Sequence, residues 1–361
     1  MASGVSEQLS TAHPQGRTRA LALTAVALLV AAVGLAWAKW LPYSARATGI
    51  ASSGRYPGHS MLTAGAGEAP LARAWTFTWT YTQAIWPALL VALVISACVD
   101  VLVPRRWLLR TLSRRTPVGG SVAGGVAALP AMMCTCCSAP LAVTMRRAGV
   151  PTSAALAFWL GNPVLNPAVL VFLALLAPWP WVAVRVLCGL LLVVGVSALL
   201  GHVVARREVV SPALAEQLAG EVPGERDVPT AELPGRLLHS FARLAVVLVP
   251  EYLVVVFLVG LVGPPLAHRL GDGGALAVLV AAAVGALLVL PTAGEVPIVL
   301  GLAAAGASAG VLGALLLALP AVSLPSAVMV GRAMGWRVTA ATGAATVAVA
   351  VLAGGLLAAL T

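Results

Sequence analysis

The chain has 361 residues, of which 60% are hydrophobic and 9% are charged, and its mean hydropathy is +0.98. Soluble domains carry about 25% charged residues, so this composition excludes a soluble globular protein and predicts an all-α, polytopic membrane protein. The formal net charge of +10 does not indicate nucleic-acid binding, because the arginines stand at the ends of apolar runs, where they retain loops on the cytoplasmic side.

The N-terminal segment, residues 1–74, contains an uninterrupted apolar run over 21–38. A cleavable leader ending at Ala38 is one interpretation, but the apolar core of a leader is usually only about 7–15 residues long. A retained first span is therefore favoured. Residues 39–74 are mixed in composition and are predicted to form an external loop. The aromatic residues predicted to lie next, at the membrane interface, are Trp75, Trp79, Tyr81 and Trp86.

The first membrane repeat is predicted to cover residues 75–201. Its full spans are predicted at about 83–103, 151–177 and 180–201. Two glycine-broken or proline-broken apolar arms, 118–133 and 139–148, lie after the first of these spans. Each arm is shorter than the roughly 20 residues that a full crossing needs. The arms are therefore predicted to form a re-entrant hairpin or two half-helices, with a cluster of cysteines at the tip.

Residues 202–236 form the one soluble-looking stretch and are predicted to be a cytoplasmic linker. The second membrane repeat then covers residues 237–361. Its predicted elements are a span at about 241–265, a short arm at 274–290, a broken segment at 291–306, and spans at about 308–331 and 338–360. The whole chain is predicted to contain about 7–9 transmembrane segments.

Landmark residues recur between the two halves of the chain. The segment Pro140–Gly149 corresponds to Pro297–Gly306, and the next proline follows fourteen residues later in each copy. The further matching prolines are Pro163 with Pro320, and Pro167 with Pro325. The arginine distribution gives the two copies opposite orientations, so we predict two inverted repeats with broken helices. That arrangement is typical of secondary transporters, whose site lies near the midplane where the breaks meet.

Prolines inside the apolar segments are predicted to break their helices. Each proline removes a backbone donor and disfavours helical structure in the residue before it. Irregular backbone at membrane depth is stable only where it is buried in protein or lines a wet cavity. The predicted breaks are at Pro130, Pro140, Pro163, Pro167, Pro291, Pro297 and Pro320.

Three of the five cysteines crowd into one kinked segment, at Cys134, Cys136 and Cys137. In a regular helix Cys136 would point away from the other two, whereas in an unwound turn all three sulfurs can converge. Cysteine sulfur selects soft partners such as Cu(I) and Zn, and by extension trivalent arsenic or antimony. The cluster is therefore predicted to bind substrate, including a soft metal ion. The competing interpretation is packing of small residues, which is what we expect of Cys98 and Cys188.

Glu295 lies at the break of the second repeat, opposite the cysteine cluster by pseudosymmetry. A carboxylate within a membrane is a functional candidate, so Glu295 is predicted to take part in proton coupling or a cation site. The alternative is that it caps the N-terminus of a half-helix. Glu251 has the same status with less support. Asp100 stands near a membrane end and is expected to be interfacial.

Two asparagines and one arginine complete the polar residues of the apolar segments. Asn162 and Asn166 stand four residues apart on an interrupted helix. They either satisfy the carbonyls that Pro163 and Pro167 leave free, or they line the solute pathway. Arg185 is expected to extend its side chain to the membrane interface.

Several short motifs carry a resemblance to a known family. They are Leu129-Pro130, Cys134-Thr135-Cys136, Pro140, Arg147-Ala148-Gly149, Ala157-Phe158-Trp159-Leu160 and Asn162-Pro163-Val164-Leu165-Asn166-Pro167. On these motifs the chain resembles the predicted-permease family that contains the ArsP-type organoarsenical efflux permeases. The resemblance covers about residues 83–340 and is densest over 129–167. It implies a multi-pass permease of the bacterial inner (plasma) membrane; the characterised type exports trivalent organoarsenicals, with cysteines implicated in recognition.

The resemblance also assigns residues by position. Cys134 and Cys136 match the family's paired cysteines. The positions that match its helix-breaking segment are Pro140, Asn162, Pro163, Asn166 and Pro167. The chain departs from the pattern at Cys137, where many relatives carry glycine, and at residues 292–295 of the second repeat, which include no cysteine. Both departures leave the particular substrate open.

The favoured hypothesis is a secondary permease that exports a soft, thiophilic solute by alternating access. Its expected partners are that small solute or soft metal ion and the lipid bilayer, with no cofactor, no nucleic acid and no enzymatic reaction; its oligomeric state is left open. The chain has no Gly-x-x-x-x-Gly-Lys loop, so it is not expected to hydrolyse ATP. The alternative is a membrane thiol–disulfide electron carrier, which needs a resolving cysteine. A structural or sensory membrane subunit is a third hypothesis.

Overall fold

The structure is a computed structural model that describes residues 14–57, 67–208, 232–267 and 274–361. Within these ranges the chain is helical, with turns and short connections and no strand. Six of the described helices are long and apolar enough to cross a membrane. A seventh crossing results if the pair Ala309–Ala321 and Leu324–Met334, bent by 51°, counts as one span. The prediction of an all-α, polytopic membrane protein is confirmed, but the described residues form six crossings, or seven with the bent pair, against the predicted 7–9.

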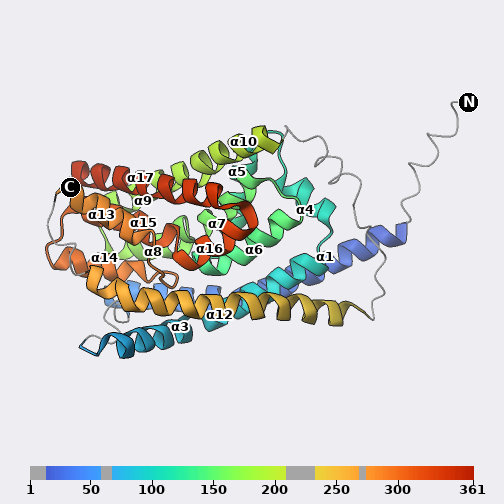
Figure 1. Cartoon of the computed structure of the whole chain (residues 1–361), viewed down its shortest axis with the longest axis horizontal. Coiled ribbons are helices and arrows are strands. Elements are labelled where there is room, and N and C mark those ends of the chain that lie inside the picture. Colours follow the sequence, from blue (N-terminus) through green and yellow to red (C-terminus); the bar gives the residue numbers. More distant parts are fainter. Residues whose placement is uncertain (1–13, 58–66, 209–231, 268–273) are drawn as a thin grey trace, which may run out of the picture.

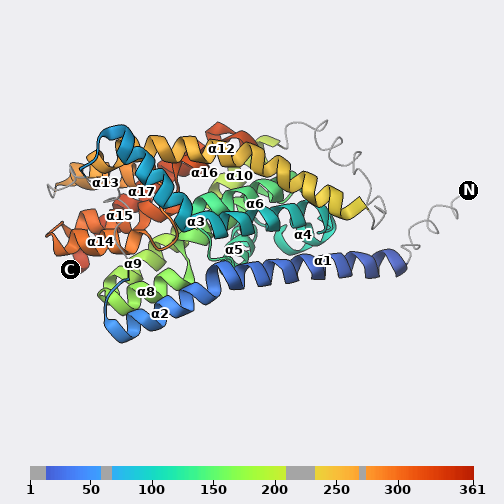
Figure 2. The same cartoon turned by 90° about the horizontal axis from the view of Figure 1, so that it is seen from below.

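The N-terminal segment forms one continuous helical rod, visible as the long blue element in Figure 2. It consists of α1 (Pro14–Leu35), a π-helical turn η1 (Ala36–Trp40) and α2 (Leu41–Ser53). The prediction of an external loop over 39–74 is therefore wrong for residues 39–53 and for residues 70–74, which begin the next helix. Lys39 directly follows the apolar run 21–38, but its ammonium is buried and the helix continues past it.

The first repeat contains two short helices where two arms were predicted, with a break between them at residues 129–134. The predicted span at 151–177 is interrupted at residues 165–166. Its elements are α3 (Pro70–Val101), α4 (Arg105–Leu112), α5 (Pro117–Ala128), α6 (Thr135–Arg147), α7 (Thr152–Val164), α8 (Pro167–Leu176), α9 (Trp179–Leu190), the π-helical turn η3 (Leu191–Val196) and α10 (Ser197–Glu208).

The second repeat has the same order of long and short helices, with its first break at residues 286–294. Its elements are α12 (Leu233–Ala267), α13 (Ala275–Gly285), α14 (Glu295–Ala304), α15 (Ala309–Ala321), α16 (Leu324–Met334) and α17 (Trp336–Leu360). Segment 202–236 was predicted to be a linker, but α10 extends into its first part and α12 begins before its end. Both ends of this segment are therefore helical. The middle of that linker, 209–231, lies outside the described residues.

The two repeats are inverted relative to each other. Helices α3 and α12, which open the two repeats, pack side by side and run in opposite directions (Figures 1 and 2). The packing is also crosswise, because α6 contacts α16 while α14 contacts α8. Helix α4, the end of α10 and the start of α12 lie at one end of the bundle, and the C-terminus lies at the other (Figure 1). The short helices of both repeats therefore meet inside the bundle.

The prolines differ in how strongly they interrupt their helices. Pro130 and Pro291 lie within the two breaks, and Pro167 is the first residue of α8. The remaining three helix-terminal prolines, Pro163, Pro297 and Pro320, lie inside the first or last turn of a helix. The prediction that Pro140 breaks its helix is wrong, because α6 continues through it to Arg147. Pro297 is the third residue of α14, a position whose amide has no intrahelical acceptor in any case.

Substitution of two adjacent glycines in α17 tests how closely α17 packs against α15. A methyl group at Gly354 would lie 2.5 Å from the carbonyl oxygen of Gly310, so the Gly354→Ala variant forces the helices apart. We expect it to lower the Tm of the purified chain in detergent, at a cost of about 1–3 kcal/mol. Gly355→Ala meets no atom within 4 Å and should leave the Tm unchanged or slightly higher. Equal losses in both variants would contradict the packing.

Candidate functional site

The two helix breaks meet at a small cavity in the middle of the bundle. Residues from both repeats line it: Cys134, Thr135, Pro163, Leu290, Pro291, Thr292, Glu295 and Pro320. The cavity has room for about one water molecule, so the site is closed in this conformation. The hydroxyl groups of Thr135 and Ser323 are 3.0 Å apart and join the start of α6 to the later break of the second repeat, between α15 and α16. The breaks thus face each other across a nearly closed space.

The three clustered thiols converge within this region. The Sγ of Cys134 lies 3.1 Å from that of Cys136 and 3.0 Å from that of Cys137. All three sulfurs lie within 4.8 Å of one another, and all three residues are buried. Cys134 is the extended N-cap of α6, and Met132 before it has a positive φ of 49°, so the chain turns sharply before the helix begins. That unwound turn is what brings the sulfurs together.

The thiols also lie at the N-terminal end of α6. The first amides of a helix lack intrahelical partners and carry a partial positive charge, which stabilises a nearby thiolate. In the second repeat, Glu295 occupies the corresponding first turn, as the first residue of α14. Two short helices therefore direct their positive ends at the same small cavity, an arrangement that favours anionic groups there.

Glu295 forms a buried ion pair with Arg185 across the repeats. The Arg185 Nη2 atom lies 2.8 Å from Glu295 Oε1, and the two side chains are 0% and 3% exposed. The expectation that Arg185 extends to the membrane interface is wrong. Its guanidinium lies inside the bundle because it finds a carboxylate and several carbonyl acceptors there. Glu295 also stands in the first turn of α14, where the helix N-terminus stabilises a carboxylate, as the alternative interpretation of this residue expected.

Arg185 also donates to three backbone carbonyls that broken helices leave without amide partners. Its Nη2 donates to the oxygen of Pro163 at 3.0 Å, and its Nη1 to that of Leu316 at 3.3 Å. Those are the carbonyls that Pro167 and Pro320, four residues later in each case, cannot engage. Its Nε donates to Val164, at the end of α7, at 3.1 Å. One side chain thus satisfies freed carbonyls from both repeats.

Asn162 and Asn166 stabilise the breaks of the first repeat through hydrogen bonds that differ from the predicted ones. Asn162 accepts a hydrogen bond from the amide of Met133 at 3.2 Å and donates to the oxygen of Phe158 at 2.8 Å. Asn166 accepts from the amides of Ala168 and Val169, and so caps α8. The prediction that these asparagines satisfy the carbonyls freed by prolines is therefore wrong. Asn166 Nδ2 is buried and has no partner within the described part of the chain.

Side chains that are distant in the sequence donate to two further carbonyls at the breaks. Ser138 donates to the oxygen of Trp159, which Pro163 leaves free, at 3.2 Å. Tyr56, beyond the end of α2, donates to the oxygen of Ala293, just before α14, at 3.0 Å. An unsatisfied carbonyl in an apolar interior costs a few kcal/mol, so these contacts stabilise the broken helices.

The residues near the cluster that the sequence analysis did not place there come from α3 and from the N-terminal rod. Tyr81 was expected at the interface, but its hydroxyl lies 3.8 Å from the Sγ of Cys136 and its ring packs on Tyr252. From the N-terminal rod, Lys39 donates to the Thr292 hydroxyl at 3.0 Å. Trp40 donates to the oxygen of Pro130 at 2.8 Å. The only signal in the sequence was a charge and an aromatic residue at the end of an apolar run.

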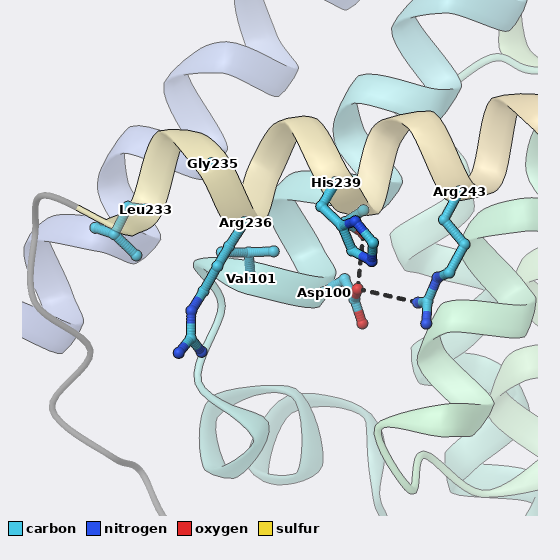
Figure 3. A pocket seen from close by; sticks show the side chains of 8 residues that line it. Asp100, Val101, Leu233, Gly235, Arg236, His239 and Arg243 are labelled. Atoms are coloured by element: carbon cyan, nitrogen blue, oxygen red, sulfur yellow. Dashed lines mark hydrogen bonds and ion pairs between the residues drawn. The ribbon is translucent and has the colours of Figure 1, made fainter.

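Other carboxylates lie away from this site. A wider, open cleft of about 380 Å³ lies between α3 and the start of α12, where Asp100 accepts from Ser240 at 2.7 Å and faces Arg243 at 3.6 Å (Figure 3). Arg236, on the same helix, points away from Asp100 (Figure 3). Asp100 is partly exposed, in agreement with an interfacial residue. The side chain of Glu251 lies outside the described part of the structure.

Comparison with known proteins identifies the class of protein. A family described as a predicted permease, of the ArsP type, matches residues 70–360. The chain belongs to this family. The UPF0718 protein YraQ of Escherichia coli strain K12 is 36% identical to this permease over 339 residues, which covers 92% of this chain and 94% of YraQ. That alignment covers more of the permease than the family match does, so it extends into the N-terminal rod. No solved structure matches.

The Arg185–Glu295 pair gives a test of the permease's central contacts. Removal of one partner from a buried pair costs about 3–5 kcal/mol, because the other charge is left uncompensated. Arg185→Met should destabilise the permease more than Glu295→Met, since Arg185 also serves three carbonyls. The double variant should be no less stable than Arg185→Met alone. Thermal unfolding of the four proteins in detergent forms a double-mutant cycle, and additive losses would show that the two charges do not interact.

Proposed function

We propose that this permease is a secondary transporter that exports a soft, thiophilic solute, a trivalent organoarsenical or a soft metal ion, across the inner membrane. The observation that carries the proposal is the convergence of three buried thiols where broken helices of two inverted repeats meet. Sulfur ligands select soft acids. Discontinuous helices near the middle of a bundle are where secondary transporters bind their substrates.

The proposed binding step uses Cys134, Cys136 and Cys137 as ligands. A thiol binds a soft acid as the thiolate, so its proton leaves to water when the solute binds. The N-terminal end of α6 stabilises that thiolate charge. Asn162 and Asn166 serve as positioning residues in this proposal, because their amides support the backbone around the cluster rather than the solute.

Transport in this proposal is by alternating access, because a cavity with room for one water cannot release a solute without rearrangement. Arg185 lies on α9 of the first repeat and Glu295 on α14 of the second, so relative movement of the repeats must stretch or break this pair. A proton that neutralises Glu295 would weaken the pair. Proton coupling through Glu295 is therefore part of the proposal.

Replacement of the clustered cysteines tests the proposal in cells. Expression of the wild-type chain in an arsenic-sensitive bacterium should protect against phenylarsine oxide or Cd²⁺, since the thiols supply the ligands. Cys→Ser changes at 134, 136 and 137, singly and together, should reduce protection, and the triple variant should match an empty vector. Cys98→Ser and Cys188→Ser are matched controls, because both cysteines are buried and neither belongs to the cluster.

Protection by the triple variant equal to that of the wild type, at equal amounts of protein in the membrane, would refute the proposed role of the cluster. The thiol oxidation state in the same cells separates the electron-carrier alternative. A carrier would show a pool of oxidised cluster cysteines that changes with the redox state of the cell, whereas a transporter keeps them as thiols.

A further inference from the structure

Lys39 is a buried cation without a countercharge. It lies in the π-helical turn between α1 and α2, and it is 5% exposed. Its ammonium donates to the Tyr43 hydroxyl at 3.2 Å and to the Thr292 hydroxyl at 3.0 Å, and both acceptors are neutral. Among the side chains that the structure describes, no carboxylate lies within 4.0 Å of it. An ammonium has three donors, so one remains available.

Lys39 is directed at the thiol cluster. Thr292, which it binds, lines the central cavity together with Cys134. A negative charge on the sulfur of Cys134 or Cys137 would be near enough to attract the ammonium. The other buried ions at the cavity, Arg185 and Glu295, neutralise each other. Lys39 therefore leaves the junction of the two breaks with one uncompensated positive charge among its described residues.

An isolated charge is expensive in an apolar interior, so a buried cation is expected to find an anion in some state of the protein. The cysteine cluster can supply that anion, because its thiols become thiolates when a solute binds. The π-helical turn fits this reading, because such irregularities occur frequently at functional sites. Lys39 then acts as a positioning charge and not as a ligand.

The charge of the occupied site depends on the solute. Three thiols that bind one divalent ion release three protons to water, and the complex of M²⁺ with three thiolates carries one negative charge. The Lys39 ammonium makes that complex neutral. An organoarsenical RAs²⁺ held by two thiolates, or As³⁺ held by three, is already neutral and would leave Lys39 unpaired. The count of charges therefore distinguishes a divalent ion from both forms of trivalent arsenic.

We propose that Lys39 neutralises a trithiolate complex of Cys134, Cys136 and Cys137 and thereby makes the site selective for a soft divalent metal ion over a trivalent arsenical. This inference rests on the proposed function, because it requires the cluster to bind the transported solute. It adds a residue from the N-terminal rod, which lies outside the 70–360 family match.

The test measures the binding of two probes, Cd²⁺ and phenylarsine oxide, to the purified full chain in lipid nanodiscs. Binding of Cd²⁺ is followed by thiolate-to-metal charge-transfer absorbance and that of phenylarsine oxide by competition with Cd²⁺ and by thiol titration. The variants are Lys39→Met, which removes the charge, and Lys39→Gln, which removes the charge but keeps a donor for Thr292. The triple Cys→Ser variant is the control for the cluster, and Tm reports folding.

Both Lys39 variants should bind Cd²⁺ about tenfold or more weakly than the wild type, because the attraction of one buried charge pair is lost. Their affinity for phenylarsine oxide should stay within about threefold of the wild type, because the arsenical complex is neutral. Equal losses for both probes would assign Lys39 a structural role and overturn the inference. Unchanged Cd²⁺ binding would overturn it as well.

Two further outcomes separate this inference from the proposed function. If the wild type binds phenylarsine oxide through the cluster but does not bind Cd²⁺, the inference fails and the proposed function stands. If the triple Cys→Ser variant binds both probes as the wild type does, the proposed function fails and the inference fails with it.

Discussion

The Arg185 guanidinium is the point at which the two halves of this bundle are held together. It donates to Glu295 of the second repeat, to Leu316 of the same repeat, and to two carbonyls at the end of α7 in the first. A planar group with several fixed donors suits such a convergence, and lysine would not replace it. Charge and hydrogen bonding are satisfied together, so a buried ion that would otherwise be costly becomes part of the fold.

The same principle applies at Pro163, Pro167 and Pro320. Each freed carbonyl lies inside protein, where water cannot satisfy it, so a donor from another helix must take the place of the missing amide. Ser138 serves Trp159, and Arg185 serves Pro163 and Leu316. The breaks are consequently fixed in shape, and the thiols they carry are held in one arrangement.

The sequence allowed the class of protein, the inverted repeats and the position of the breaks to be predicted, because spans obey a length rule and prolines act on their own helix. It did not allow the partners to be predicted. Arg185 and Glu295 are 110 residues apart, and Lys39 and Thr292 are 253 apart, so neither contact leaves a local pattern. Arg185 was assigned to the membrane interface from its neighbours, which is the common place for such residues, and Lys39 was not selected at all.

The N-terminal rod borders the site together with the two repeats. Trp40 binds the carbonyl of Pro130 at the first break, while Lys39 and Tyr56 bind Thr292 and Ala293 at the second. A rod that contacts both breaks cannot follow both repeats if they move apart, so some of these three hydrogen bonds must break when the cavity opens. The two hydrogen bonds at the second break come from the rod and its end, and only one comes to the first. The packing of the rod, however, is with the first repeat, because α1 and η1 contact α3, α2 contacts α8, and the rings of Tyr43 and Tyr56 pack on Phe172. The rod is therefore expected to stay with the first repeat and to release Thr292 and Ala293 if the repeats move apart.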